Sequence, residues 1–158
     1  MAELVFVCWG NICRSPMAEV LARDWARDHG IDAVVASAAV SREEEGRPMD
    51  RRAQQVLREA GHDVARGRAA TLIDDAIFGS ARLVVAAEQH HVARMAPLAE
   101  RHREVSVRLV TDFIPGATPG SPLDDPWYGD VTDFRETLGL LEAAMPQIFA
   151  ELERLRQR

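Results

Sequence analysis

The sequence predicts an α/β fold: a single three-layer domain over residues 1–158, with a four-stranded parallel sheet and helices on both faces. Two observations lead to this prediction. Short apolar runs typical of buried strands alternate along the chain with segments of helical periodicity. Strands joined by helical crossovers lie parallel, because such connections are right-handed and place the helices over the sheet. A chain of 158 residues with 47% hydrophobic residues suits one hydrophobic core.

The predicted strands are the four apolar runs, each of a length that crosses a sheet once. They cover residues 4–8, 33–37, 83–87 and 105–110. The carboxyl ends of parallel strands meet at one edge of the sheet, and open α/β sheets bind their ligands there. The order of elements is typical of a flavodoxin-like arrangement, so we expect the segment after the first strand to lie at a binding site.

The predicted helices occupy the segments between and after the strands. They cover residues 16–29, 50–60, a short segment starting within 71–75, 89–101, and a long segment from 131. Gly30 and Gly61 are expected to end two of them, since glycine readily adopts the left-handed backbone that closes a helix. Pro146 lies inside the long helix and is expected to kink it.

A loop without periodicity separates the fourth strand from the last helix, over residues 111–130. It is rich in proline and glycine and carries an acidic pair followed by two aromatic residues. Loops of this length inside a compact domain are usually functional. We therefore expect the second half of the functional site in this loop.

The most informative segment follows the first strand, where the chain reaches Cys8 and then turns sharply into a helix. Gly10 and Asn11 tolerate the positive φ angles that a tight loop demands. Ser15 is predicted to cap the helix, and Pro16 suits its first position. Successive backbone N–H groups in such a loop, together with a helix start, form a binding site for an anion.

Two side chains of this loop suggest chemistry as well as binding. The thiolate of Cys8 is the reactive form of cysteine, and a helix start beside an arginine stabilises it. Arg14 can bind the oxygens of a phosphate with both arms of its guanidinium group. The segment thus predicts a cysteine nucleophile placed in a phosphate cradle.

Composition excludes several other classes of protein. The net charge of −6 and the pI near 5.4 argue against nucleic-acid and anionic-membrane partners. All 19 basic residues are arginine, which rules out a Walker-type loop and a lysine nucleophile. No signal peptide or spanning segment is visible, so we expect a cytoplasmic protein.

The cysteines and histidines predict no bound cofactor. Cys8 and Cys13 do not form a disulfide scaffold, and they match no zinc spacing with the histidines, so no metal site is predicted. The five histidines show no ligand spacing and are expected on the surface; they are His29, His62, His90, His91 and His102.

Two motifs resemble one known family. Residues 8–16, Cys-Trp-Gly-Asn-Ile-Cys-Arg-Ser-Pro, resemble the phosphate-binding signature of the low-molecular-weight protein tyrosine phosphatases. Residues 124–130, Asp-Asp-Pro-Trp-Tyr-Gly-Asp, are similar to the acid loop of the same family. The resemblance extends over nearly the whole chain and is loose only in the middle. It implies a hydrolase that acts through a phosphocysteine intermediate.

The resemblance also implies roles for individual residues. Cys8 is the expected nucleophile, Arg14 the phosphate-binding arginine and Asp125 the general acid, although a plain Asp-Pro turn is the alternative for Asp125. The phosphoryl oxygens would be bound by the loop made of Trp9, Gly10, Asn11, Ile12, Cys13, Arg14 and Ser15. The entrance would be walled by Trp9, Trp127 and Tyr128, with core packing as the alternative for Tyr128. The loop would be supported by Asn11, Ser15 and Ser37.

The expected substrate is a phosphotyrosine protein or another aryl phosphate, and the expected state is a monomer or weak dimer. The family also suggests a reversible disulfide between Cys8 and Cys13, with plain burial as the alternative for Cys13. The histidine that supports the cysteine loop in the family is missing near Arg66, so another residue, an arginine among the candidates, must replace it. Glu43, Glu44 and Glu45 form an acidic rim that would favour neutral or basic peptides.

Three other functions remain open. A thiol-dependent arsenate reductase can share this loop but relays electrons through distal cysteines, which this chain lacks. A protein-arginine phosphatase is also similar, but it has threonine at the position of Ile12. The third is a phosphate-binding module without turnover, which the joint presence of Cys8, Arg14 and Asp125 disfavours.

Overall fold

The computed structural model describes all 158 residues and is built on one four-stranded sheet in the order β2-β1-β3-β4. Every pair of neighbouring strands is parallel. The strands are β1 (Leu4–Cys8), β2 (Val35–Ala39), β3 (Leu83–Ala86) and β4 (Ser106–Leu109). The predicted fold class is confirmed.

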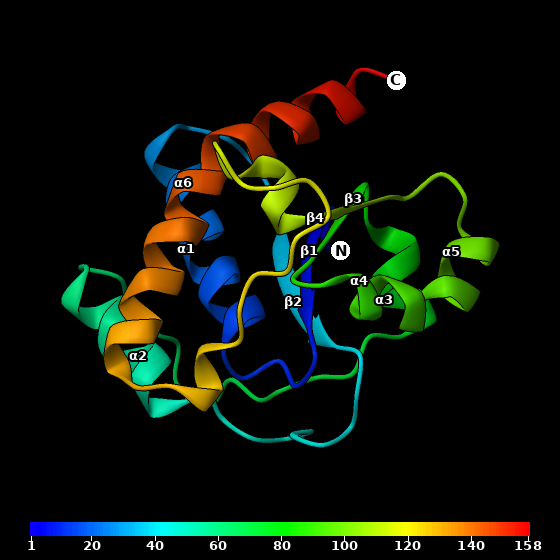
Figure 1. The fold of residues 1–158 in the computed structure, drawn as a ribbon. Helices are drawn as coiled ribbons and strands as arrows, with labels where there is room; N and C mark the ends of the chain where they lie inside the picture. Colours follow the sequence, from blue (N-terminus) through cyan, green and yellow to red (C-terminus); the bar gives the residue numbers. More distant parts are fainter.

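Helices cover both faces of the sheet, as Figure 1 shows. One face carries α1 (Arg14–Asp28), α2 (Arg51–Glu59) and α6 (Val131–Arg156). The other carries α3 (Asp75–Ser80), α4 (Gln89–Arg94) and α5 (Ala96–Arg101). Two hydrophobic clusters fill the spaces between these three layers.

The side chains of β1 alternate between these two clusters. Phe6 and Cys8 belong to the cluster under α1 and α6, whereas Val5 and Val7 belong to the opposite cluster. β1 lies inside the sheet, with β2 on one side and β3 on the other. The chain runs from β1 to β2 and then passes back over β1 to β3. This reversal of strand order opens a crevice at the carboxyl end of β1, directly at Cys8.

Two predicted elements differ from the structure. The second strand runs over Val35–Ala39 rather than 33–37, because its register with β1 pairs Ala39 with Cys8 and leaves Val34 half exposed. The predicted helix 89–101 is divided at Met95 into α4 and α5. Pro97 lies two residues after Met95 and has no N–H to continue the helical hydrogen bonds across this point.

The start of α1 also differs from the prediction. The helix begins at Arg14 after Cys13, without a side-chain cap, so Ser15 and Pro16 lie within its first turn. Ser15 is not the N-cap because its hydroxyl group is engaged by Cys8 and Asn11. The other helix ends agree with expectation: Gly30 and Gly61 have φ angles of 64° and 89°.

The long loop leads from β4 to α6 through two short 3-10 turns, η1 (Val110–Phe113) and η2 (Pro126–Tyr128). At its end, Asp130 caps α6 by accepting hydrogen bonds from the backbone of Thr132 and Asp133. α6 continues through Pro146 without ending. No helix combines the length and the apolar character needed to cross a membrane.

Candidate active site

Cys8 is the last residue of β1, and its side chain is almost completely buried. Its sulfur lies 3.0 Å from the hydroxyl oxygen of Ser15. Asn11 Nδ2 donates to that same hydroxyl oxygen at 2.7 Å, which leaves the Ser15 proton free to point at sulfur. The Ser15 hydroxyl can therefore donate to the Cys8 sulfur and hold it in position.

The loop turns at Asn11, the only non-glycine residue with a positive φ angle, 58°. The predicted left-handed conformation holds for Asn11 and is wrong for Gly10, which has an ordinary φ. Glycine is required at position 10 for another reason. A Cβ atom there would lie 2.9 Å from Cγ of Glu44, closer than real Cβ contacts.

The side chain of Asn11 is fully buried beneath the loop and has four partners. Nδ2 donates to the hydroxyls of Ser15 and Ser37, at 2.7 and 2.9 Å. Oδ1 accepts from the backbone N–H of Thr71 at 3.1 Å and from Arg68 Nη2 at 2.8 Å. The structure thus brings Asn11, Ser15 and Ser37 into one hydrogen-bonded group under Cys8.

Arg68 occupies the supporting place for which the sequence offered no histidine. Besides Asn11 Oδ1 it donates to the carbonyl oxygen of Asn11 at 3.1 Å and to Ser37 Oγ at 3.1 Å. Burial lowers the pKa of its guanidinium, and the nearby Glu19 and Cys8 oppose this shift. An arginine was among the expected replacements near Arg66, and Arg68 makes these contacts.

Arg14 is also buried and joins the cysteine loop to the long loop. Its Nη1 donates to Glu88 Oε2 at 2.7 Å and to the carbonyl oxygen of Leu123 at 2.6 Å. Its Nη2 lies 3.5 Å from Asp125 Oδ2. One guanidinium group therefore holds two residues of the long loop in place.

The segment around Asp125 is held by a second arginine that the sequence did not point to. Arg52 Nη1 donates to the carbonyl oxygens of Gly129 and Trp127, at 2.9 and 3.3 Å, and its guanidinium lies 4.5 Å from the ring centre of Phe134. Asp50 orients Arg52 through an ion pair of 3.0 Å. Burial would raise the pKa of Asp50, but hydrogen bonds from Arg52 outweigh it and lower the pKa.

A cavity of about 190 Å³ opens above Cys8. It is lined by both loops and the acidic rim, through Cys8, Trp9, Gly10, Ile12, Cys13, Arg14, Glu43, Glu44, Asp125, Trp127 and Tyr128. Asn11 and Ser15 do not line it and lie behind the loop. Tyr128 is 83% exposed, which excludes core packing for this residue.

The acidic rim is tied to the aromatic wall. Trp9 Nε1 donates to Glu43 Oε2 at 2.9 Å, and the guanidinium of Arg94 lies 4.9 Å from the Trp9 ring centre. Glu44 lines the cavity, whereas Glu45 pairs with Arg42 outside it. Two of the three expected rim carboxylates, Glu43 and Glu44, therefore line the cavity.

Comparison with known proteins identifies this constellation. The sequence model of one family, described as low molecular weight phosphotyrosine protein phosphatase, matches residues 3–158. The chain belongs to this family. The resemblance stated from the two sequence motifs is therefore confirmed over nearly the full length of the protein.

Individual relatives agree with this assignment. A low molecular weight protein-tyrosine-phosphatase of Streptomyces coelicolor is 37% identical over 153 residues, which cover 94% of this chain and 92% of the relative. A protein-arginine-phosphatase of Bacillus subtilis is 28% identical over 98% of this chain and 99% of its own length. A solved protein tyrosine phosphatase from Entamoeba histolytica shares the fold, with a TM-score of 0.87 over 98% of both chains at 24% identity.

The second cysteine of this phosphatase-family chain is also buried, and both cysteines are free in the structure. Burial raises the pKa of the Cys13 thiol far above its ordinary value, and the nearby negative charges of Asp50, Cys8 and Asp125 raise it further. Cys13 is therefore a protonated thiol at neutral pH, which makes it a slow nucleophile.

One histidine contradicts the sequence expectation. His91 is completely buried rather than exposed, because α4 turns it beneath Glu88 and toward Arg14. Burial, together with the charges of Arg14 and His90, lowers its pKa to about 3. His91 is therefore uncharged at neutral pH, and no sequence pattern indicated its burial.

Proposed function

We propose that this chain is a protein tyrosine phosphatase that hydrolyses phosphotyrosine in proteins through a phosphocysteine intermediate. The observation that carries the proposal is the shared cavity: a cysteine sulfur, an arginine and an aspartate from two distant loops line one space of about 190 Å³. A nucleophile, a phosphate-binding cation and an acid are the groups that hydrolysis of a phosphate ester requires. Residues 1–158 act as one catalytic domain in this proposal.

In the first step, the Cys8 thiolate attacks phosphorus in line with the ester oxygen. The new S–P bond forms as the P–O bond to the aryl group breaks, and Asp125 gives its proton to the departing oxygen. Arg14 and the backbone N–H groups of the loop bind the three remaining phosphoryl oxygens. Because the loop is already held by Asn11 and Arg68, these donors need no rearrangement to stabilise the transition state.

In the second step, the Asp125 carboxylate removes a proton from water, and the water oxygen attacks the phosphocysteine. The S–P bond breaks, inorganic phosphate is released, and the Cys8 thiolate is restored. The Ser15 hydroxyl lies 3.0 Å from the sulfur and can donate a hydrogen bond to it as it leaves. Asp125 ends the cycle protonated and ready for the next ester.

The walls of the cavity favour an aryl ester. Trp9, Trp127 and Tyr128 present flat faces at the entrance, and Trp127 and Tyr128 meet edge to face with ring centres 5.1 Å apart. A phosphotyrosine ring can pack between such faces, whereas phosphoserine has no ring to offer. These aromatic faces thereby favour the flat ring of a phosphotyrosine side chain.

The test is hydrolysis of p-nitrophenyl phosphate and of a phosphotyrosine peptide by the wild type, Cys8→Ser and Asp125→Asn. Cys8→Ser should abolish turnover. Asp125→Asn should lower kcat by about 10²- to 10⁴-fold for the peptide, and less for the nitrophenyl ester, whose leaving group needs less protonation. A Cys8→Ser protein that retains activity would contradict the proposal, and an inactive wild type that binds phosphate would indicate the binding module instead.

A protein-arginine phosphatase is the second candidate, favoured by the 28% identity to the Bacillus subtilis enzyme of that name. Ile12, where that class has threonine, and the aromatic entrance argue for the aryl ester. Comparing kcat/KM on matched phosphotyrosine and phosphoarginine peptides separates the two. A higher value for phosphoarginine would overturn the tyrosine preference while leaving the cysteine mechanism intact.

A further inference from the structure

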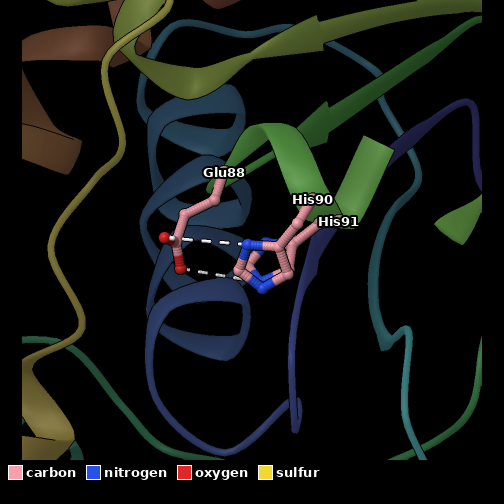
Figure 2. A group of neighbouring side chains, drawn as sticks. All are labelled: Glu88, His90 and His91. Carbon is pink, nitrogen blue, oxygen red and sulfur yellow. Dashed lines mark ion pairs between the residues drawn. The ribbon is translucent and has the colours of Figure 1, made fainter. Parts of the chain in front are cut away.

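A cluster of three side chains lies where β3 ends and α4 begins, outside the lining of the cavity. Figure 2 shows the carboxylate of Glu88 facing the imidazole rings of both His90 and His91. His91 Nε2 lies 3.7 Å from Glu88 Oε2, and His90 Nδ1 lies 3.9 Å from Glu88 Oε1. One ligand atom from each of the three side chains falls within 4.8 Å of the others.

His91 is unusual within this cluster. It is fully buried, yet neither ring nitrogen has a hydrogen-bond partner, and these two are the only such side-chain atoms in the protein. Buried polar atoms in folded proteins nearly always have a partner. His91 Nε2 instead lies 3.7 Å from a carboxylate oxygen of Glu88, too far for a hydrogen bond.

The distances suit a metal ion bound by these side chains. Zinc binds imidazole nitrogen at about 2.0–2.1 Å and carboxylate oxygen at about 2.0–2.2 Å, so tetrahedral ligands lie roughly 3.4 Å apart. The observed separations of 3.7 and 3.9 Å reach this value with small side-chain movements. Two imidazoles and one carboxylate are donors that zinc and its neighbours prefer over magnesium or calcium.

We propose that Glu88, His90 and His91 form a binding site for a divalent transition-metal ion such as Zn²⁺. The half-exposed ring of His90 faces solvent and provides the entry path, while His91 closes the inner side. Water fills the fourth ligand position. No sequence spacing predicted this site, because two adjacent histidines and a carboxylate two residues earlier match no common zinc motif.

The site has a consequence for catalysis that rests on the proposed function. Glu88 Oε2, a ligand oxygen in this site, also accepts the 2.7 Å hydrogen bond from Arg14. A dication at Glu88 competes with Arg14 for this oxygen and repels its guanidinium group. Because Arg14 must be aligned with the phosphoryl oxygens, the bound ion lowers kcat, and zinc acts as an inhibitor at a distance from the sulfur.

The binding test uses Co²⁺ as a spectroscopic probe and calorimetric titration with Zn²⁺, without substrate. The full-length Cys8→Ser protein should bind one equivalent, with the visible absorption of tetrahedral Co²⁺ and without the near-ultraviolet band of thiolate ligation. His90→Ala and His91→Asn should each weaken binding at least about ten-fold, since loss of even an outer partner of a metal ligand costs about 10–100-fold.

His102→Ala is the matched control, because His102 also lies beside two carboxylates, Asp75 at 3.0 Å and Glu104 at 3.7 Å, and should leave affinity unchanged. His90 is half exposed, so the His90→Ala protein should keep its fold. This variant therefore tests metal binding at the site even if His91→Asn unfolds. Metal binding that is unchanged in His90→Ala would contradict the proposed site. Metal binding that is lost in Cys8→Ser would contradict it as well.

Zinc inhibition of turnover is measured separately on the wild type and on His90→Ala. The wild type should lose kcat with increasing Zn²⁺, and His90→Ala should need at least about ten-fold more zinc for the same loss. Equal inhibition of both proteins overturns the link to Arg14. Absence of phosphatase activity would refute the proposed function and leave the binding result unaffected.

Discussion

The two loops that meet at the cavity are held in different ways. In the cysteine loop, Cys8, Asn11 and Arg14 are each at most 3% exposed, and their polar atoms are paired within the protein. In the long loop, the Asp125 side chain is 28% exposed and Tyr128 is 83% exposed. The first loop is part of the core, whereas the second lies against the surface and is fastened mainly by Arg14 and Arg52.

This difference matches what each loop must do. Phosphoryl oxygens are stabilised best by donors that are already fixed before the substrate arrives. The acid loop, in contrast, must admit a bulky aryl group and release it again, which an exposed segment allows. The comparison predicts large losses of activity from changes in the cysteine loop. Changes that only loosen the long loop should cause small losses of activity.

The largest effect is expected from Arg14→Lys. Lysine keeps the charge but loses the planar fork, and it cannot serve Glu88, Leu123 and a phosphate together. We expect kcat/KM on p-nitrophenyl phosphate to fall by about 10³-fold or more. Thermal unfolding serves as the control for folding. A loss below ten-fold would mean that charge, not geometry, governs the cradle.

The next effect is expected from the pair Asn11→Gly and Asn11→Ala. Both remove four hydrogen bonds and should lower kcat about 10²-fold, as expected when a binding loop shifts by about an ångström. Alanine should in addition lose about 1–2 kcal/mol of stability, because residue 11 has φ 58°. Equal melting temperatures of the two variants would refute the strain argument.

A smaller effect is expected from Arg52→Gln, which releases the acid loop from α2. The loss of its hydrogen bonds to Trp127 and Gly129 should lower kcat/KM by about ten-fold, the equivalent of about one hydrogen bond. Arg135→Gln is the matched control, since Arg135 pairs with Glu59 on the exposed surface. An unchanged rate for Arg52→Gln would show that Arg14 alone holds the loop.

The smallest effect is expected at the acidic rim. Glu43→Gln and Glu44→Gln together should reduce the preference for basic over acidic phosphopeptides by roughly two- to five-fold at low salt, and by less at high salt. Glu45→Gln is the control, because Glu45 does not line the cavity. If all three substitutions act alike, the effect comes from net charge and not from the rim.

The sequence predicted the parts of this protein whose causes are local. The alternation of apolar runs and amphipathic segments predicted the parallel sheet and the succession of strands and helices along the chain, and the motif around Cys8 predicted the turn at Asn11. The phosphate cradle stays a prediction of the same motif. One of its errors was also local in origin: Ser15 is a good capping residue by type, but its hydroxyl is bound by Cys8 and Asn11.

The parts that escaped prediction depend on contacts between distant segments. Arg68 reaches Asn11 across 57 positions, and Arg52 reaches Gly129 across 77. With 19 arginines in the chain, no pattern separates these two from the others. The burial of His91 likewise follows from how α4 packs on the sheet, which neither periodicity nor spacing encodes.

The hydrogen bond from Arg14 to the carbonyl of Leu123 joins residues 109 positions apart. During synthesis the nucleophile emerges from the ribosome early, yet the contacts that align its arginine exist only after the final third of the chain has followed. A nascent chain therefore lacks this contact until Leu123 has been made and the long loop has folded against Arg14.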